Sequence, residues 1–256
     1  MTDSYFEKRN ILLKLEYCGK DFAGWQIQAN NRTVQGVLKD NLERFLRHKV
    51  KITGSGRTDS GVHALAQYAN FYTTNSLSAT QIKYKLNRIL PGDIVVTACR
   101  EVPLSFDSRQ SAIFRSYRYL ISERATALNR YFSWNLARGL DLAQLTSLAI
   151  MIKQAHHFEN FCKTKSRREN NECIIKDARW SRRGGFLRFD ITANRFLHNM
   201  VRLLVGSMVA VLDGRLETNK FREMLDFSID EKAKCIAPAN GLYLVNVGYG
   251  PPVKRK

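Results

Sequence analysis

The sequence predicts an α+β fold with mostly antiparallel sheets. Segments of alternating hydrophobicity, typical of strands, and segments with helical spacing occur in both halves, without the strict alternation that builds a parallel sheet. The chain has 256 residues, of which 44% are hydrophobic, with only 5 Pro and 15 Gly. This composition excludes disordered, collagen-like and low-complexity chains, and the length suffices for one large domain or two smaller ones.

The first half is expected to form four strands and two helices. Apolar residues alternate from Ile11 to Tyr17 as in a half-buried strand. Apolar residues from Val34 to Leu46 recur at helical spacing, which predicts a helix up to His48, and Thr33 before it is a typical N-cap. After these elements we expect a strand ending at Ile52, a strand over 68–73, a helix over 79–90 that stops before Pro91-Gly92, and a strand over 94–101.

The second half repeats this mixture of strands and helices. A linker opens at Pro103, so we place a boundary between an N-terminal domain, residues 1–104, and a C-terminal domain, residues 105–256. We expect strands over 114–122, over 186–192 after the Gly184-Gly185 turn, and over 242–249. The expected helices are one capped by Asp141 and running to Ala155, one over 196–212 ended by Gly214, and one over 218–227.

The chain is basic over its whole length. It holds 41 Lys and Arg against 23 Asp and Glu, a formal net charge of +18, and cations outnumber anions in both halves. Phosphates attract Lys and Arg and release counterions on binding, so we favour a nucleic acid partner over a merely solvated basic surface. Two segments supply the candidate contacts. A stretch that mixes basic and aromatic residues contains Arg109 and Arg115. A polar loop contains Lys163, Lys165, Arg167 and Arg168.

The sequence favours a cytoplasmic protein without a membrane anchor. No apolar stretch approaches the roughly 18 residues of a membrane span, and the first ten residues lack the apolar core of a signal peptide. The five cysteines are an odd number without a C-x-x-C pair, which is typical of a reducing compartment. We reject a zinc site because no closely spaced ligand pair occurs among its candidates, His156, His157, Cys162 and Cys173.

The segment over 54–64 concentrates glycines around Arg57 and Asp59. Glycines let the backbone approach a ligand closely, so the loop can present Asp59 at a fixed angle, although it could also be an ordinary polar turn. Three rival chemistries fail on inspection. The chain lacks the Gly-Lys-Ser/Thr of a P-loop and the loop lacks a G-x-S-x-G elbow. It contains only one Asp-Ser-Gly, where an aspartic protease needs two carboxylates, so only a shared site in a dimer could rescue that interpretation.

The sequence around Asp59 closely resembles the signature loop of the tRNA pseudouridine synthase A family. GRTDSGVHALAQ (56–67) carries the glycine, the Arg-Thr-Asp and the Gly-Val-His-Ala of that loop. Further segments resemble the family in the same order, namely YCGKDFAGWQIQ (17–28), TVQGVL (33–38), FDSRQSAIFRSYRYLI (106–121), HHFENFCK (156–163), FLHNMVRLLVGSM (196–208) and APANGLYLVNVGY (237–249). Several motifs in order over nearly the whole chain are far more specific than one motif.

This resemblance implies a reaction and a set of site residues. The family breaks the bond between uracil N1 and ribose C1′ in tRNA, rotates the base and joins C5 to C1′, which requires no cofactor and no metal. The resemblance makes Asp59 the nucleophile, Arg202 its ion-pair partner, and Tyr117 the residue that stacks on the uracil and takes part in proton transfer. It makes Arg57 the residue that fills the space of the flipped nucleotide, and Leu242 the apolar wall of the pocket. Without the resemblance, Tyr117, Arg202 and Leu242 would be interpreted as ordinary packing residues.

The resemblance also implies an arrangement and partners. It suggests two α/β subdomains joined around a central basic cleft, a homodimer, and action on the anticodon stem-loop of tRNA at positions 38–40. Whether the covalent link forms to uracil or to ribose stays open. The chain departs from the family at Cys18 and His157, where Asp is usual or common, and neither position is the nucleophile. His63 and His198 are expected to be structural.

One alternative stays open at this point. The chain could be a non-catalytic RNA-binding or RNA-folding protein on the same scaffold. The presence of Arg57, Asp59, Tyr117 and Arg202 together favours the enzyme.

Overall fold

The chain divides into two units, which are described separately. The computed structural model describes residues 7–163 and 172–250. The first unit consists of Met1–Ile113 with Leu244–Lys256, and the second of Phe114–Tyr243. Residues from the C-terminal end of the chain therefore join the first unit, and the expected boundary after residue 104 stays a prediction.

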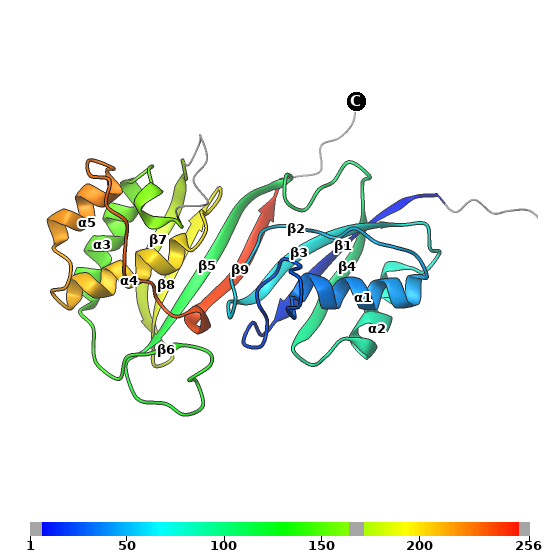
Figure 1. Cartoon of the computed structure of the whole chain (residues 1–256), viewed down its shortest axis with the longest axis horizontal. Coiled ribbons are helices and arrows are strands. Elements are labelled where there is room, and N and C mark those ends of the chain that lie inside the picture. Colours follow the sequence, from blue (N-terminus) through cyan, green and yellow to red (C-terminus); the bar gives the residue numbers. More distant parts are fainter. Residues whose placement is uncertain (1–6, 164–171, 251–256) are drawn as a thin grey trace, which may run out of the picture. The chain divides into compact units, whose positions relative to one another are not determined.

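The first unit contains a mostly antiparallel sheet covered by two helices (Figure 1). Its strands lie in the order β4-β1-β3-β9, and β1 pairs antiparallel with both β3 and β4. A two-residue strand, β2, pairs with β3. The apolar faces of the helices are buried, and α2 packs against β4. The bounds are β1 (Arg9–Tyr17), α1 (Val34–Leu46), β2 (Thr53–Gly54), β3 (His63–Thr73), α2 (Ala79–Ile89), β4 (Ile94–Val102) and β9 (Leu242–Tyr249), of which this unit holds the part from Leu244 onward.

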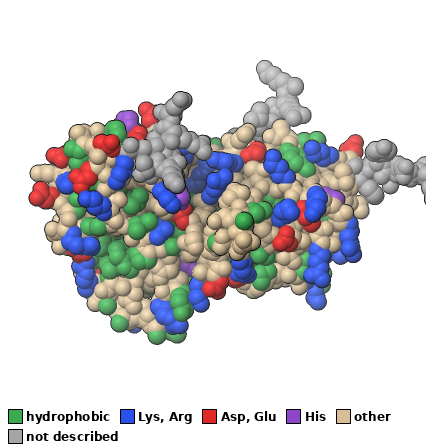
Figure 2. Space-filling view, viewed as in Figure 1, with side chains coloured by type: hydrophobic (Ala, Val, Ile, Leu, Met, Phe, Trp, Pro, Cys, Tyr) green, Lys and Arg blue, Asp and Glu red, His purple; other side chains and the backbone are tan. Residues whose placement is uncertain are grey.

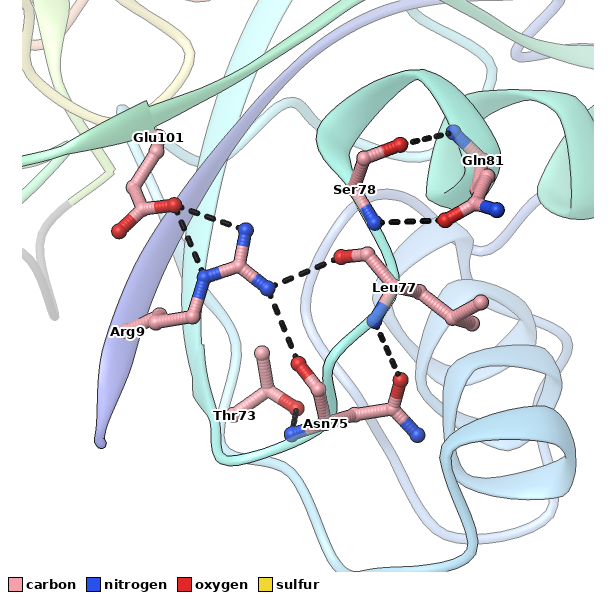
Figure 3. A network of polar contacts seen from close by, with 7 residues as sticks. All are labelled: Arg9, Thr73, Asn75, Leu77, Ser78, Gln81 and Glu101. Atoms are coloured by element: carbon pink, nitrogen blue, oxygen red, sulfur yellow. Dashed lines mark hydrogen bonds and ion pairs between the residues drawn. The ribbon is translucent and has the colours of Figure 1, made fainter. Parts of the chain in front are cut away.

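Side-chain hydrogen bonds fix where the helices of the first unit begin. The Thr33 hydroxyl accepts a hydrogen bond from the Gly36 N–H at 3.2 Å, as its position before α1 predicted. Ser78 and Gln81 cap α2 reciprocally (Figure 3). In the same network the Arg9 guanidinium donates to Glu101 and to the carbonyl oxygens of Asn75 and Leu77, so the connection between β3 and α2 is held against β1.

The second unit also combines a mostly antiparallel sheet with helices. Its strands lie in the order β5-β8-β7, with antiparallel pairs on both sides of β8, and β6 pairs parallel with the end of β5. The helix α3 packs against β7, and eleven of the thirteen residues of α4 are buried, so α4 lies at the centre of this unit. The bounds are β5 (Ala112–Ser122), β6 (Trp134–Asn135), α3 (Leu142–Gln154), η1 (Glu159–Phe161), β7 (Ile175–Arg183), β8 (Phe186–Ala193), α4 (Met200–Leu212), α5 (Thr218–Leu225) and η3 (Ala239–Gly241).

The predicted α+β class with mostly antiparallel sheets is confirmed, but several elements differ from expectation, among them the strand expected over 68–73, which begins at His63. The helix expected from Phe196 begins at Met200, because Asn199 adopts a left-handed conformation with a φ of 64°. The strand expected to end at Ile52 is absent from the described residues, and only the short β2 follows that position. The strand β7 was not expected, because charged residues interrupt its apolar alternation. Over residues 7–163 and 172–250, no helix is long and apolar enough to cross a membrane.

Candidate active site

The glycine-rich loop of the first unit runs from β2 to β3 and carries Asp59. The Asp59 side chain is half-buried and the neighbouring Arg57 is exposed. The backbone N–H of Trp25 donates to the Thr58 carbonyl oxygen at 3.1 Å, and the backbone N–H of Val62 donates to the Asp59 carbonyl oxygen at 3.2 Å. The backbone is therefore fixed on both sides of the Asp59 Cα atom, and the carboxylate leaves the loop in a defined direction.

The turn-rich segment over 17–28 packs directly on this loop. A Cβ atom on Gly19 would lie 2.0 Å from the Val62 carbonyl oxygen, so no other residue fits there without a backbone shift. Gly24, which has a φ of +95°, also lies close to the loop, with 2.7 Å between its ideal Cβ position and the Thr58 carbonyl oxygen. The close contacts with the loop therefore require glycine at both positions.

Buried polar side chains on β1 and β3 form hydrogen bonds with the loop. The hydroxyl groups of Tyr17 and Thr58 lie 2.8 Å apart, and Gln67 contacts Ser55 and the Gly56 carbonyl oxygen. Burial raises the pKa of Tyr17 well above its ordinary value, although hydrogen bonds to Thr58 and Gln67 act in the opposite direction. Tyr17 is therefore neutral and acts through its hydroxyl hydrogen bond.

His63, at the start of β3, is part of the same support. Its Nδ1 atom accepts a hydrogen bond from the Gly19 N–H at 3.1 Å, and the residue is 2% exposed. An imidazole held in this way is oriented by the backbone, which agrees with the structural role expected for His63. His198, the other histidine expected to be structural, is exposed just before α4.

In the second unit, Tyr117 and Leu242 lie on strands β5 and β9. The Tyr117 ring packs edge to face on Phe196, with 5.1 Å between the ring centroids and 89° between the planes. Leu242 is buried at 4% exposure directly after η3. The segment before Leu242 is held by Tyr119. The Tyr119 hydroxyl donates to the Pro238 carbonyl oxygen at 2.7 Å, and Gly241 packs against the Tyr119 ring.

Arg202 lies in the first turn of α4 and is tied to the segment before η3. Its Nε atom donates to the Ala237 carbonyl oxygen at 2.8 Å, and the Ala237 N–H donates back to the Arg202 carbonyl oxygen at 3.0 Å. Gly206, one turn further along α4, permits this approach, since a Cβ atom there would lie 2.3 Å from the Cys235 carbonyl oxygen. The guanidinium is thus half-buried and oriented, and its Nη1 atom also donates to the Asn199 Oδ1 atom at 3.4 Å.

The basic candidates are in different environments. Arg109 is exposed, and Arg115 donates to the Asn194 carbonyl oxygen at 3.0 Å. Lys163 is exposed, whereas Lys165, Arg167 and Arg168 lie outside the described residues. Lys and Arg side chains of the described residues are spread over much of the visible face in Figure 2.

Each unit therefore carries a part of the predicted site. Arg57 and Asp59 share one loop of the first unit, and Tyr117, Arg202 and Leu242 belong to the second. Among residues 7–163 and 172–250, no group of three or more His, Cys, Asp or Glu side chains is placed to hold a metal ion. Sequence reasoning missed the supporting residues Tyr17 and Gln67. Both residues stand within the segments 17–28 and 56–67 that resemble the family, but their residue types alone did not single them out.

Known proteins are similar to this chain over nearly its whole length. The chain matches the tRNA pseudouridine synthase family over residues 15–109 and 155–250. It is 42% identical to tRNA pseudouridine synthase A of Chlorobium luteolum over 242 residues, which cover 94% of this chain and 96% of the relative. It is 40% identical to the protein of the same name from Chlorobaculum tepidum and 35% identical to that from Acetivibrio thermocellus, each over 243 residues. These alignments cover 94% of this chain and 98% and 100% of the two relatives.

Proposed function

This chain belongs to the tRNA pseudouridine synthase family, and on that premise we propose that it isomerises uridine to pseudouridine in tRNA with Asp59 as the nucleophile. The observation that carries this proposal is the half-buried carboxylate of Asp59 on a loop whose backbone is fixed on both sides. The matched region 15–109 includes that loop. The enzyme is therefore an isomerase that acts within one nucleotide.

The reaction defines what the protein must supply. The bond between uracil N1 and ribose C1′ breaks, the base rotates, and C5 joins C1′ with loss of the C5 proton and return of a proton to N1. A carboxylate can carry this change by forming a transient covalent bond to the ribose carbon or to the uracil ring. No electrons enter or leave, so side chains and a flipped base suffice.

The residues of the second unit complete the proposed site. Arg202 keeps Asp59 ionised, because an opposite charge favours the carboxylate over the acid. Tyr117 stacks on the uracil and assists the removal of the C5 proton, and Leu242 closes the other side of the ring. The support for these roles is local rigidity, since Ala237 orients Arg202, Phe196 fixes the Tyr117 ring, and Leu242 is buried.

The proposed RNA contacts are made by Arg57, next to Asp59, and by basic residues elsewhere in the chain. Arg57 is exposed beside Asp59, so it can enter the space that a flipped nucleotide leaves and contact phosphate. Arg109, Arg115, Lys163, Lys165, Arg167 and Arg168 contribute affinity through the phosphate backbone without selecting a base. We further propose positions 38–40 of the anticodon stem-loop as targets, a homodimer as the active form, and the cytoplasm as its location.

The alternative of a non-catalytic RNA-binding protein gains no support. The relatives that match over 94% of this chain are named as synthases.

The proposal is tested by mapping pseudouridine in tRNA incubated with the purified protein. A transcript with uridines at positions 38, 39 and 40 should gain pseudouridine there, and a matched transcript with cytidines at these positions should gain none. Pseudouridine at other positions only would overturn the proposed target, and no pseudouridine in any tRNA would overturn the proposed activity.

A further inference from the structure

A set of buried polar side chains joins the Asp59 loop to the strands β1 and β3. Tyr17, Ser55, Thr58 and Gln67 are each between 0% and 6% exposed. Polar groups in such positions lose their hydration and stabilise the fold little compared with apolar residues of the same shape. Their presence therefore needs a reason beyond the filling of the core.

An irregularity in the sheet brings two members of this set to the loop. The register between β1 and β3 runs from Leu15 opposite Gln67 to Tyr17 opposite Ala64, so β3 contains one extra residue at this point. Such a bulge re-aims side chains at the end of a strand pair. Leu15 and Tyr17 lie on the same side of β1, so Tyr17 and Gln67, which is opposite Leu15, face the same side of the sheet.

Gln67 fixes the start of the loop. Its Oε1 atom accepts a hydrogen bond from the Ser55 hydroxyl at 2.5 Å, and its Nε2 atom donates to the Gly56 carbonyl oxygen at 2.9 Å. The Ser55 N–H also donates to the Tyr68 carbonyl oxygen at 2.8 Å. The two residues before Arg57 are therefore held by a side chain and by the backbone.

Tyr17 fixes the residue that precedes Asp59. Its hydroxyl lies 2.8 Å from the Thr58 hydroxyl, and both groups are buried. The Thr58 carbonyl oxygen is bound at the same time by the backbone N–H of Trp25. With its side chain and its carbonyl group both held, Thr58 has little freedom to rotate, and the Asp59 Cα–Cβ bond inherits that direction.

We propose that Tyr17 and Gln67 are positioning residues, which set the direction of the Asp59 carboxylate through Thr58 and through Ser55 with Gly56. This inference rests on the proposed role of Asp59 as the nucleophile. Neither residue touches the substrate. They determine how accurately the carboxylate meets the reacting atom, and an error of about 1 Å in such a placement lowers rates by about 100-fold.

The test removes the Tyr17–Thr58 hydrogen bond from either side without changing the size of the side chains much. Tyr17→Phe and Thr58→Val should each lower kcat by about 10-fold to 100-fold, with KM for tRNA within about twofold of the original value. The double variant should be no slower than the slower single variant, because Tyr17→Phe already removes the bond that Thr58→Val removes. Thr58→Ser keeps the hydroxyl and should restore most of kcat. Tyr72→Phe is the matched control, since it removes a tyrosine hydroxyl bound to the Leu104 carbonyl oxygen in the same unit, and its kcat should be unchanged.

The outcomes separate this inference from the proposed function. If Asp59→Asn is inactive while folded Tyr17→Phe and Thr58→Val keep the original kcat, the positioning role is overturned and the nucleophile stands. If Asp59→Asn still turns over, no nucleophile is left to position, and both proposals fail. Should Tyr17→Phe not fold, Thr58→Val with Thr58→Ser decides alone, and equal kcat for these two variants at the original level contradicts the inference.

Discussion

The backbone N–H of Gly19 donates a hydrogen bond to the Nδ1 atom of His63 at 3.1 Å. A ring nitrogen that accepts this bond carries no proton, so the neutral tautomer of His63 bears its hydrogen on Nε2. The contact joins the two glycine-rich segments that surround Asp59, and it identifies His63 as part of the scaffold.

This contact predicts how substitutions of His63 behave. His63→Asn can place its Oδ1 atom near the position of Nδ1, so it should keep kcat within a few-fold of the original value. His63→Ala leaves the Gly19 N–H without a partner and should lower the free energy of unfolding by about 1–3 kcal/mol. Turnover and thermal unfolding of the two variants check this. A stable His63→Asn variant without activity would instead make His63 a proton-transfer group.

The close approach at Gly19 predicts that any side chain there lowers the stability of the protein. Gly19→Ala places a methyl group 2.0 Å from the Val62 carbonyl oxygen, so the backbone of the loop must shift. Overpacking of this kind costs about 1–3 kcal/mol or more, and kcat should fall with it. Gly92→Ala is the control, because no atom lies within 4 Å of its added Cβ and its stability should stay the same or rise. Equal stability and activity for the two variants would show that the loop tolerates displacement.

The half-buried guanidinium of Arg202 predicts a charge effect on the reaction. Arg202→Met keeps the length of the side chain and removes the charge, so kcat should fall sharply and the remaining activity should require a higher pH, because a carboxylate without a cation ionises less readily. Arg202→Lys keeps a charge but loses the planar contact to Ala237, and it should be intermediate. The measurement is kcat against pH for the three proteins. An Arg202→Met variant with an unchanged rate and profile would restrict Arg202 to the support of Ala237.

The basic residues of the segment over 163–168 predict a separation of affinity from chemistry. Replacing Lys163, Lys165, Arg167 and Arg168 by Ser should weaken tRNA binding and flatten the dependence of log affinity on log salt, by somewhat under about one unit for each lost phosphate contact. The rate at saturating tRNA should survive. Binding measured over a salt series checks this prediction. An unchanged slope would exclude this segment from the RNA interface, and the stretch with Arg109 and Arg115 would become the main candidate.

Local signals allowed much of the fold to be predicted. Thr33 and Asp141 cap their helices as expected, because a capping hydrogen bond involves residues only two or three positions apart. The strand β7 was missed because its pairing with β8, not its own apolar pattern, determines it. The start of α4 was placed too early because the left-handed conformation of Asn199 has no clear signature in an apolar segment.

In the candidate site, too, local motifs could be predicted and contacts between distant residues could not. Asp59 and Arg57 are prominent in a glycine-rich motif, so the sequence alone singles them out. The support from Tyr17 could not be predicted, because its partner Thr58 is 41 residues away and the contact depends on a bulge between β1 and β3. A strand tyrosine with an ordinary alternating pattern gives no sign of such a role.

The central claim is that the Asp59 carboxylate is the nucleophile, and single-turnover formation of pseudouridine by Asp59→Asn tests it most directly. The variant should bind tRNA within a few-fold of the original protein, because affinity comes mostly from Lys and Arg contacts to phosphate. Asp21→Asn, which changes an exposed carboxylate in the same unit, should react at the original rate. Mass spectrometry of the variant excludes deamidation of the introduced asparagine back to aspartate. The account predicts no pseudouridine above the level without enzyme, and substantial turnover by the intact Asp59→Asn variant would contradict it.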